Sequence, residues 1–248
     1  MESTSPRQSD AQPFYQALDQ TYVTQQRMPR YTCSIVARML RQIGPLKGRP
    51  DAVSLDFGAG IGTLAQIWAT QFAGEVKVLE LDPHQQKILR EQGFETFGSL
   101  DEVAFGSLDI VYSSNVLEHV EDDFGALKAI HARLKPHGRL LLYLPALQML
   151  WNEMDVAVGH FRRYSRSGLR QVIQASGFRL DEIGYDDSLG VVAALAVKLF
   201  GFQYGSGLAT DRNYQTYDSI IYPISTLIDR LGGKYLLGKN LFAAATKL

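Results

Sequence analysis

The chain has 248 residues and a formal net charge of −1, with 46% hydrophobic and 21% charged residues. These values are ordinary for a soluble globular protein, and the length suits one α/β domain with accessory elements. The near-neutral charge excludes a strongly basic surface, so no nucleic acid partner is expected. Cys33 is the only cysteine and cannot form an internal disulfide, which fits a reducing cytoplasm.

Residues 1–13 are polar and are expected to form a disordered tail. They lack the apolar core of a signal peptide or a membrane anchor. The longest apolar run, at residues 189–202, contains Lys198 and is shorter than the roughly 20 residues of a spanning helix. We therefore expect a cytoplasmic protein without a membrane span.

Helical and strand patterns alternate along the rest of the chain. Residues 14–50 are expected to form a helical cap with a break near Pro29. Strands are expected at 52–57, 75–81, 95–97, 108–113, 139–144, 178–185 and 240–247, and helices at 63–72, 83–92, 123–134, 165–175, 189–202 and 219–230. Ser165 is expected to N-cap the helix at 165–175. The alternation predicts an α/β fold with a parallel sheet covered on both faces.

Residues 55–62, LDFGAGIG, place three glycines in the turn after the first strand. Gly58, Gly60 and Gly62 permit positive φ angles and a close approach of the backbone to a ligand at a helix N-terminus. Glu80 ends the second strand about 20 residues later, where an acid can bind both hydroxyls of a ribose. Together these residues predict a cofactor that contains adenosine.

The residues beside the glycines distinguish two classes of cofactor. A nicotinamide site has a third glycine at the position of Thr63, and Asp56 would place a negative charge beside its pyrophosphate. An acid is better placed near the amine of S-adenosylmethionine. A nicotinamide-dependent oxidoreductase is therefore the weaker alternative.

Four successive motifs, LDFGAGIG, LELDP, LDIVYSSNVLEHV and RLKPHGRLLLYLP, resemble those of class I S-adenosylmethionine-dependent methyltransferases. Within that class the chain resembles the small-molecule enzymes of ubiquinone biosynthesis, over residues 52 to about 185. The resemblance implies a Rossmann-like, seven-stranded, mostly parallel sheet whose last strand, NLFAAATK, is antiparallel. The domain would cover residues 51–248, with acceptor and lid elements at about 146–165 and 187–235.

The resemblance also implies an activity, methyl transfer to oxygen or nitrogen of a small-molecule acceptor, with S-adenosylhomocysteine as product. The pathway would be secondary-metabolite, quinone or glycan biosynthesis, and the protein a monomer or homodimer. The alternative is a non-methylating protein that binds S-adenosylmethionine, either a cyclase or decarboxylase or a scaffold.

The same resemblance assigns parts of the cofactor to residues of the chain. The three glycines would line the methionine moiety, Glu80 would bind the ribose, and Leu81 would pack on the adenine. Leu81 could otherwise be an ordinary core residue, or be both. Ser99 or Asp101 would contact the adenine amino group. The full expected set is Asp56, Gly58, Ala59, Gly60, Gly62, Glu80, Leu81, Ser99, Asn115, Leu117 and Tyr31.

Two histidines are candidate bases or orienting groups, since a base helps methyl transfer when the acceptor has a proton to lose. His119 completes the pair Glu118–His119 after the fourth strand, and otherwise it braces the following helix. His160 lies in GHFRRYS, residues 159–165, an element that contributes to the acceptor pocket in the family. Otherwise His160 fixes this loop through hydrogen bonds.

Arg163, Tyr164 and Tyr22 are candidate acceptor-binding residues. A basic cluster formed by Arg162, Arg163, Arg166 and Arg170 either is a solvated helix face or binds a carboxylate or phosphate of the acceptor. Tyr22 and Tyr31 either touch ligands or pack at the rim of the sheet. No metal is expected, because the sequence shows no obvious cluster of carboxylates.

Overall fold

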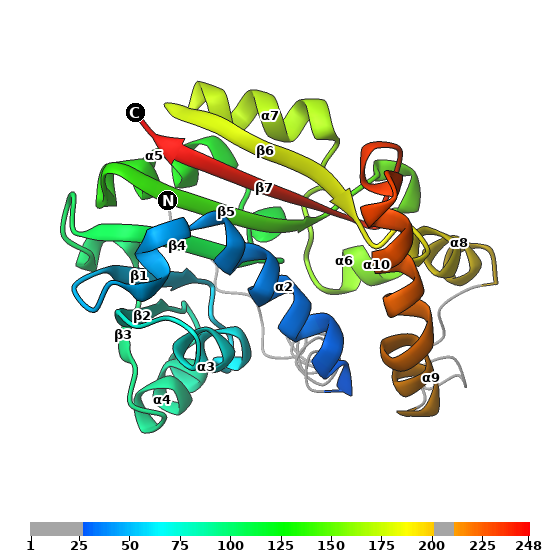
Figure 1. Cartoon of the computed structure of the whole chain (residues 1–248), viewed down its shortest axis with the longest axis horizontal. Helices are drawn as coiled ribbons and strands as arrows, with labels where there is room; N and C mark the ends of the chain where they lie inside the picture. Colours follow the sequence, from blue (N-terminus) through cyan, green and yellow to red (C-terminus); the bar gives the residue numbers. More distant parts are fainter. Residues whose placement is uncertain (1–26, 201–210) are drawn as a thin grey trace, which may run out of the picture.

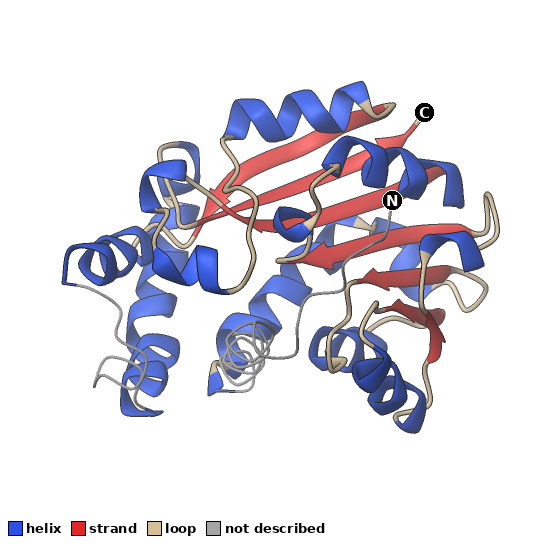
Figure 2. Cartoon of the chain, turned by 180° about the vertical axis from the view of Figure 1, so that it is seen from behind, coloured by secondary structure: helices blue, strands red, loops and turns tan. Residues whose placement is uncertain are grey.

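The computed structural model describes residues 27–200 and 211–248. A seven-stranded sheet forms its centre, with helices on both faces (Figures 1 and 2). The strands are β1 (Val53–Phe57), β2 (Glu75–Leu79), β3 (Glu95–Phe97), β4 (Leu108–Ser114), β5 (Leu134–Pro145), β6 (Phe178–Asp186) and β7 (Asn240–Lys247). Residues 1–26, including Tyr22 and the expected tail, lie outside the described residues.

The strand order is β3-β2-β1-β4-β5-β7-β6. The first five strands are parallel, whereas β7 runs antiparallel to both β5 and β6. This topology confirms the Rossmann-like, mostly parallel sheet with an antiparallel last strand. Strand β5 begins at Leu134, five residues earlier than expected, through an irregular pairing with β4 between Leu108 and Ile110.

The helices follow the strands in the expected order. They are α2 (Pro29–Gln42), α3 (Thr63–Ala69), α4 (Pro83–Glu91), α5 (Asp123–Arg133), α6 (Glu153–Ala157), α7 (Arg166–Ala175), α8 (Gly190–Phe200), α9 (Asp211–Thr216) and α10 (Tyr222–Arg230). Short 3₁₀ turns include η1 (Gly44–Gly48), η2 (Leu100–Glu102), η3 (Leu117–His119), η4 (Gln148–Leu150) and η6 (Gly233–Tyr235), and a π-helical turn, η5 (Tyr217–Ile221), joins α9 to α10. No helix within the described ranges is long and apolar enough to cross a membrane.

Side chains at the helix N-termini account for where several helices start. The Asp82 carboxylate accepts hydrogen bonds from the backbone N–H groups of His84 and Gln85, and Pro83 occupies the first turn of α4. Ser165 caps α7 by accepting a hydrogen bond from the Gly168 N–H, as expected from the sequence. Such caps satisfy N–H groups that have no partner within the helix.

The hydrophobic core has two layers, one on each face of the sheet. Alternate residues of β4 and β5, such as Val111 and Leu142, pack with α5 and α7. Their neighbours Tyr112 and Leu141 pack with α2 and α3, where the Trp68 ring stacks on Tyr112 with centroids 4.2 Å apart. This two-sided burial fixes the register of the strands. It also places the carboxyl ends of the parallel strands, and the loops that follow them, along one edge.

Candidate functional site

The glycine loop after β1 has a backbone that requires glycine. Gly58, Gly60 and Gly62 have φ angles of 79°, 58° and 85°. A Cβ atom at Gly58 would lie 2.4 Å from Cγ2 of Val116, so no side chain fits there. Gly62 is also the left-handed N-cap of α3. The loop therefore follows a backbone path without side chains at Gly58, Gly60 and Gly62, and its N–H groups at Gly58, Ala59 and Gly60 are held by Leu79 and Glu80.

The loop is joined to the end of β2 by the carboxylate of Glu80. Oε2 of Glu80 accepts a hydrogen bond of 2.8 Å from the Gly60 N–H, and Oε1 accepts from the N–H groups of Leu81 and Asp82. A carboxylate has about four lone-pair sites, so one remains for a further donor. The Leu81 side chain is 73% exposed next to this group. Leu81 is thus a surface residue, and the alternative that it belongs to the core is wrong.

Asp56 lies buried at the end of β1, directly before the loop. Its Oδ2 atom has no hydrogen-bond partner in the described part of the chain. Burial, with a smaller effect from nearby Glu80, raises the pKa of Asp56 to about 8. A buried acid without a partner is costly, and a cation beside it would remove that cost.

The ends of β3 and β4 carry the other expected cofactor residues. Ser99 caps η2 by accepting a hydrogen bond from the Asp101 N–H, and Asp101 pairs with Arg133. Asn115 has a positive φ of 54° and donates its backbone N–H to the carbonyl of Tyr143. Leu117 is buried in the core cluster on the α5 side of the sheet.

Glu118, His119 and His160 converge beside the end of β4. The imidazole centroids of His119 and His160 are 4.5 Å apart, and Nε2 of His160 lies 3.8 Å from Oε1 of Glu118. Glu118 is fully buried, and neither of its oxygens has a hydrogen-bond partner within the described residues. One ligand atom from each of the three side chains lies within 4.8 Å of the others, a group that can hold a metal ion.

Burial sets the protonation of two members of this group. It raises the pKa of Glu118 to about 8. Burial, together with nearby His160, lowers the pKa of His119 to about 4. At neutral pH, His119 is therefore uncharged and Glu118 is mostly protonated.

Asp155, which sequence reasoning missed, connects His160 to Arg163. Its Oδ1 atom lies 2.7 Å from Nδ1 of His160 and accepts a hydrogen bond of 2.8 Å from Nε of Arg163. Burial alone would raise the pKa of Asp155, but these two hydrogen bonds outweigh it and hold that pKa below its usual value. In the sequence, the spacing of Asn152 and Asp155 matches a capping box at the start of α6. That pattern indicates a helix terminus and not a contact with His160.

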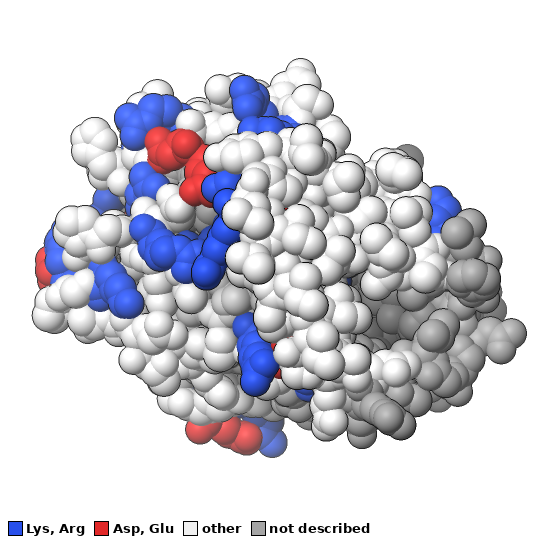
Figure 3. Space-filling model, turned by 45° about the vertical axis from the view of Figure 1, so that its right-hand side comes forward, with Lys and Arg blue, Asp and Glu red and all other residues white. Residues whose placement is uncertain are grey.

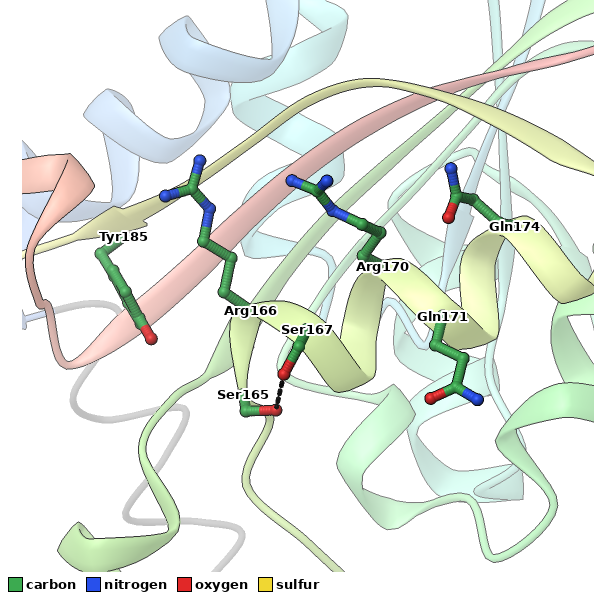
Figure 4. A pocket seen from close by; sticks show the side chains of 7 residues that line it. All are labelled: Ser165, Arg166, Ser167, Arg170, Gln171, Gln174 and Tyr185. Carbon is green, nitrogen blue, oxygen red and sulfur yellow. Dashed lines mark hydrogen bonds between the residues drawn. The ribbon is translucent and has the colours of Figure 1, made fainter.

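Arg162 and Tyr164 are bound into the fold. The Tyr164 hydroxyl donates to Oδ2 of Asp123, and Arg162 forms an ion pair with the same carboxylate. Arg166 and Arg170 instead have no acidic partner among the residues described and line an open cavity of about 800 Å³ with Tyr185 (Figure 4). The basic cluster of the sequence therefore has two parts. Arg162 and Arg163 form ion pairs within the fold, whereas Arg166 and Arg170 line the open cavity.

Tyr31 belongs to a buried hydrogen-bonded group at the ends of β5, β6 and β7. Its hydroxyl lies 3.2 Å from that of Tyr143, and Asn240 donates to both hydroxyls. The Tyr143 hydroxyl in turn donates to Asp186. These hydrogen bonds link α2 to the sheet and hold the Tyr31 side chain at the rim of the sheet.

The sequence matches the methyltransferase domain family over residues 24–183. The ubiquinone biosynthesis O-methyltransferase of Xanthomonas campestris pv. campestris (strain B100) is 32% identical over 103 residues, which cover 38% of this chain and 43% of that protein. A ubiquinone biosynthesis O-methyltransferase of Xanthomonas oryzae pv. oryzae (strain PXO99A) is 33% identical over 98 residues. The chain thus spans less than half the length of the curated relatives it matches.

Solved structures share the fold at low sequence identity. Phosphoethanolamine N-methyltransferase 2 of Haemonchus contortus, in complex with phosphomonomethylethanolamine and S-adenosylhomocysteine, has a TM-score of 0.57 and 18% identity over 86% of this chain and 52% of that one. A putative methyltransferase of Haloferax volcanii, in complex with the activator Trm112, has a TM-score of 0.61 and 14% identity over 98% and 99%. With this fold and a family match over more than half of its residues, the chain belongs to the methyltransferase domain family, among the class I S-adenosylmethionine-dependent methyltransferases.

Proposed function

We propose that the protein transfers the methyl group of S-adenosylmethionine to an oxygen or nitrogen atom of a small molecule. The observation that carries this proposal is the contact between the glycine loop and Glu80, in which the Gly60 N–H binds Oε2 of Glu80 at 2.8 Å. In this contact the glycine loop and a carboxylate lie side by side at the switch point of the sheet, where cofactors of this fold class bind.

The cofactor would lie across the carboxyl ends of β1, β2 and β4. Its amino-acid end would contact the glycine loop and the Asn115 region, with the amine near the unpartnered carboxyl group of Asp56. One ribose hydroxyl would donate to the one remaining lone-pair site of Glu80. The adenine would pack on exposed Leu81, near Ser99.

Bound S-adenosylmethionine supplies an electrophilic methyl group whose bond to sulfur breaks as the acceptor attacks, so no nucleophilic side chain is needed. The task of the protein is to align the acceptor, exclude water and accept a proton. Asp155 binds Nδ1 of His160, so Nε2, which lies 3.8 Å from Oε1 of Glu118, would be the nitrogen that accepts a proton from a hydroxyl. His119, uncharged because burial lowers its pKa to about 4, would orient the acceptor.

Segment 146–165 and the described parts of segment 187–235, residues 187–200 and 211–235, would cover the acceptor, and the likeness to ubiquinone biosynthesis O-methyltransferases supports a hydroxyl acceptor. Arg163 and Tyr164 would act in acceptor binding by holding this cover in place. We further propose that the protein is cytoplasmic and acts as a monomer or homodimer.

The test is a binding titration with S-adenosylmethionine and NADH, followed by incubation with a methyl-labelled donor and a panel of phenols and amines. We expect S-adenosylmethionine alone to bind and labelled product to form. Glu80→Ala should weaken cofactor binding by about 1–3 kcal/mol, the scale of hydrogen bonds to a charged group, whereas Glu91→Ala, on the exposed face of α4, should not.

Tight binding without labelled product from the panel or from cell extract would favour the non-methylating alternative. Binding of NADH with no affinity for S-adenosylmethionine would contradict the proposal. Equal affinity of wild type and the Glu80 variant would show that the cofactor lies elsewhere.

A further inference from the structure

Helix α10 and the turns on either side of it expose a row of large apolar side chains. Ile220, Ile224, Leu227 and Leu231 follow one another at intervals of four, three and four residues, which places them on one helix face. Each is at least 49% exposed, and Leu231 reaches 81%. Tyr235 and Leu236 continue the row beyond the helix. We call these six residues the α10 patch.

The opposite face of the same segment is polar and buried. Asp229 accepts a hydrogen bond of 2.8 Å from the Asp187 N–H, and Ser225 accepts one of 3.0 Å from the Leu189 N–H. Asp218 accepts from the N–H groups of Tyr31 and Arg30. A surface helix normally buries its apolar face, so the polarity of this segment is reversed. The buried hydrogen bonds fix the rotation of the helix and keep the apolar face outward.

Within residues 217–239, the charged side chains that are not buried are all basic. Asp218 and Asp229 are the only acids in residues 217–239, and both point inward. Arg230 is exposed at the end of the helix, and the Lys234 ammonium lies 5.1 Å from the ring centroid of Tyr235. Figure 3, which brings this side of the molecule forward, shows a broad surface with few charged side chains. An apolar face with Arg230 and Lys234 beside it is complementary to an anionic surface.

We propose that the α10 patch docks the protein onto a membrane surface that contains anionic lipids. Apolar side chains enter the boundary between headgroups and acyl chains, while Arg230 and Lys234 contact phosphate groups. A second copy of the chain fits this surface less well. A symmetric dimer places the patch against itself, so that the basic residues of both copies meet without an acid in the patch to pair with them.

The test of this proposal does not depend on the proposed function. The α10 patch contains none of the residues assigned to the cofactor or to proton transfer, and vesicle binding is measured without an acceptor, although the patch overlaps segment 187–235, which is proposed to cover the acceptor. Its test is co-sedimentation of the full chain with vesicles of phosphatidylcholine alone and with vesicles that also contain phosphatidylglycerol. We expect binding to the anionic vesicles and weaker binding at high salt, since salt screens the basic residues.

Two sets of variants separate the apolar and electrostatic contributions. Leu227→Asp combined with Leu231→Asp should abolish sedimentation with vesicles. Arg230→Gln and Lys234→Gln should each weaken binding to the anionic vesicles about fivefold, equivalent to about 1 kcal/mol per basic residue. Phe105→Asp, at a 75% exposed apolar position outside the patch, is the matched control and should bind as wild type does.

Thermal melting and S-adenosylmethionine titration of each variant show whether it has folded. Wild-type protein that stays in the supernatant with both kinds of vesicle overturns the proposal. A concentration-dependent dimer that the double aspartate variant abolishes, without binding to vesicles, also overturns it and assigns the patch to a second copy.

Discussion

The Nδ1 atom of His160 lies 2.7 Å from Oδ1 of Asp155, and the Asp155 side chain is buried at the start of α6. A buried carboxylate in this position selects the tautomer of the imidazole and fixes the direction of its other nitrogen. Asp155 is therefore a positioning residue for His160 in the proposed reaction. The contact joins residues from α6 and from the loop that follows it.

Asp155→Asn tests this role. We expect kcat to fall about tenfold or more, because general bases contribute roughly 10²–10⁴ and the amide no longer stabilises a protonated imidazole. The KM for S-adenosylmethionine should not change, and the lower limb of the pH profile of kcat should shift. Steady-state kinetics at a series of pH values measures kcat, the KM for S-adenosylmethionine and the pH profile of kcat.

Arg163→Gln is the control for Asp155→Asn, because it breaks the ion pair with Asp155 and leaves the contact with His160. A loss of kcat as large as that of Asp155→Asn would mean that Asp155 acts only through folding of the loop. A selective rise in the KM of the acceptor would instead place Arg163 in acceptor binding, as the sequence analysis expects.

Gly58→Ala should destabilise the protein and weaken cofactor binding. The added Cβ meets Val116 at 2.4 Å and must adopt a φ of 79°. The strained backbone should lower the free energy of unfolding by roughly 1–3 kcal/mol, and the clash with Val116 should lower it further. Urea unfolding of the variant measures the change in the free energy of unfolding.

Gly93→Ala is a matched control for the glycine loop, since Gly93 has a φ of 90° and nothing within 4 Å of an added Cβ. Its free energy of unfolding should fall only by the cost of placing a non-glycine residue at a positive φ. Val116→Ala combined with Gly58→Ala should recover part of the lost stability, because two of the three clashing atoms are removed. An equal loss of unfolding free energy in Gly58→Ala and Gly93→Ala would show that the Val116 side chain moves aside without a measurable energetic cost.

Asp56 should make stability depend on pH. Its folded pKa of about 8 lies above the ordinary 3.8, so the folded protein keeps a proton that the unfolded chain releases between these values. The free energy of unfolding should therefore decrease as pH rises through that window, and Asp56→Asn should remove this part of the decrease. Urea unfolding at a series of pH values measures it.

Cofactor binding should release a proton from the same residue at neutral pH, because a cationic amine favours the ionised carboxylate. Calorimetric titrations in buffers of different ionisation enthalpy measure the release. Wild type and Asp56→Asn with the same proton release would show that the amine lies away from Asp56.

Removal of metal ions tests the group formed by Glu118, His119 and His160. The sequence analysis expects a reaction without metal, so kcat should be unchanged after dialysis against EDTA, and elemental analysis should find no bound ion. Loss of activity that one divalent cation restores in wild type, but not in His160→Ala, would assign the group as a metal centre.

The meeting of the glycine loop with Glu80 at one edge of the sheet could be predicted from the sequence, because it depends on local patterns. Gly58 to Gly62 are consecutive in one turn, and Glu80 lies at the end of the next strand, so strand periodicity alone brings them to one edge. The antiparallel β7 followed from the resemblance. Ser165 was recognised because a cap depends on the next three residues only.

The acceptor half depends on contacts between distant residues, and most of it could not be predicted. Glu118 and His160 are 42 positions apart in the sequence and meet only because residues 159–165 fold back on the end of β4. The arginine-rich run is extended as far as Tyr164 and helical from Arg166, so neighbouring arginines point to different surroundings. Hydrophobic periodicity in the sequence does not predict this change from loop to helix between Tyr164 and Arg166.

The antiparallel direction of β7 also decides what can be attached to the chain. Asn240, at the start of β7, meets Tyr31 and Tyr143 at the rim of the site, whereas Lys247 pairs with Phe178 at the far end of β6. Leu248 therefore emerges on the side of the sheet away from the glycine loop (Figure 1). A fluorophore or surface tether fused after Leu248 leaves the cofactor edge and the α10 patch open, so both can be assayed on one immobilised protein.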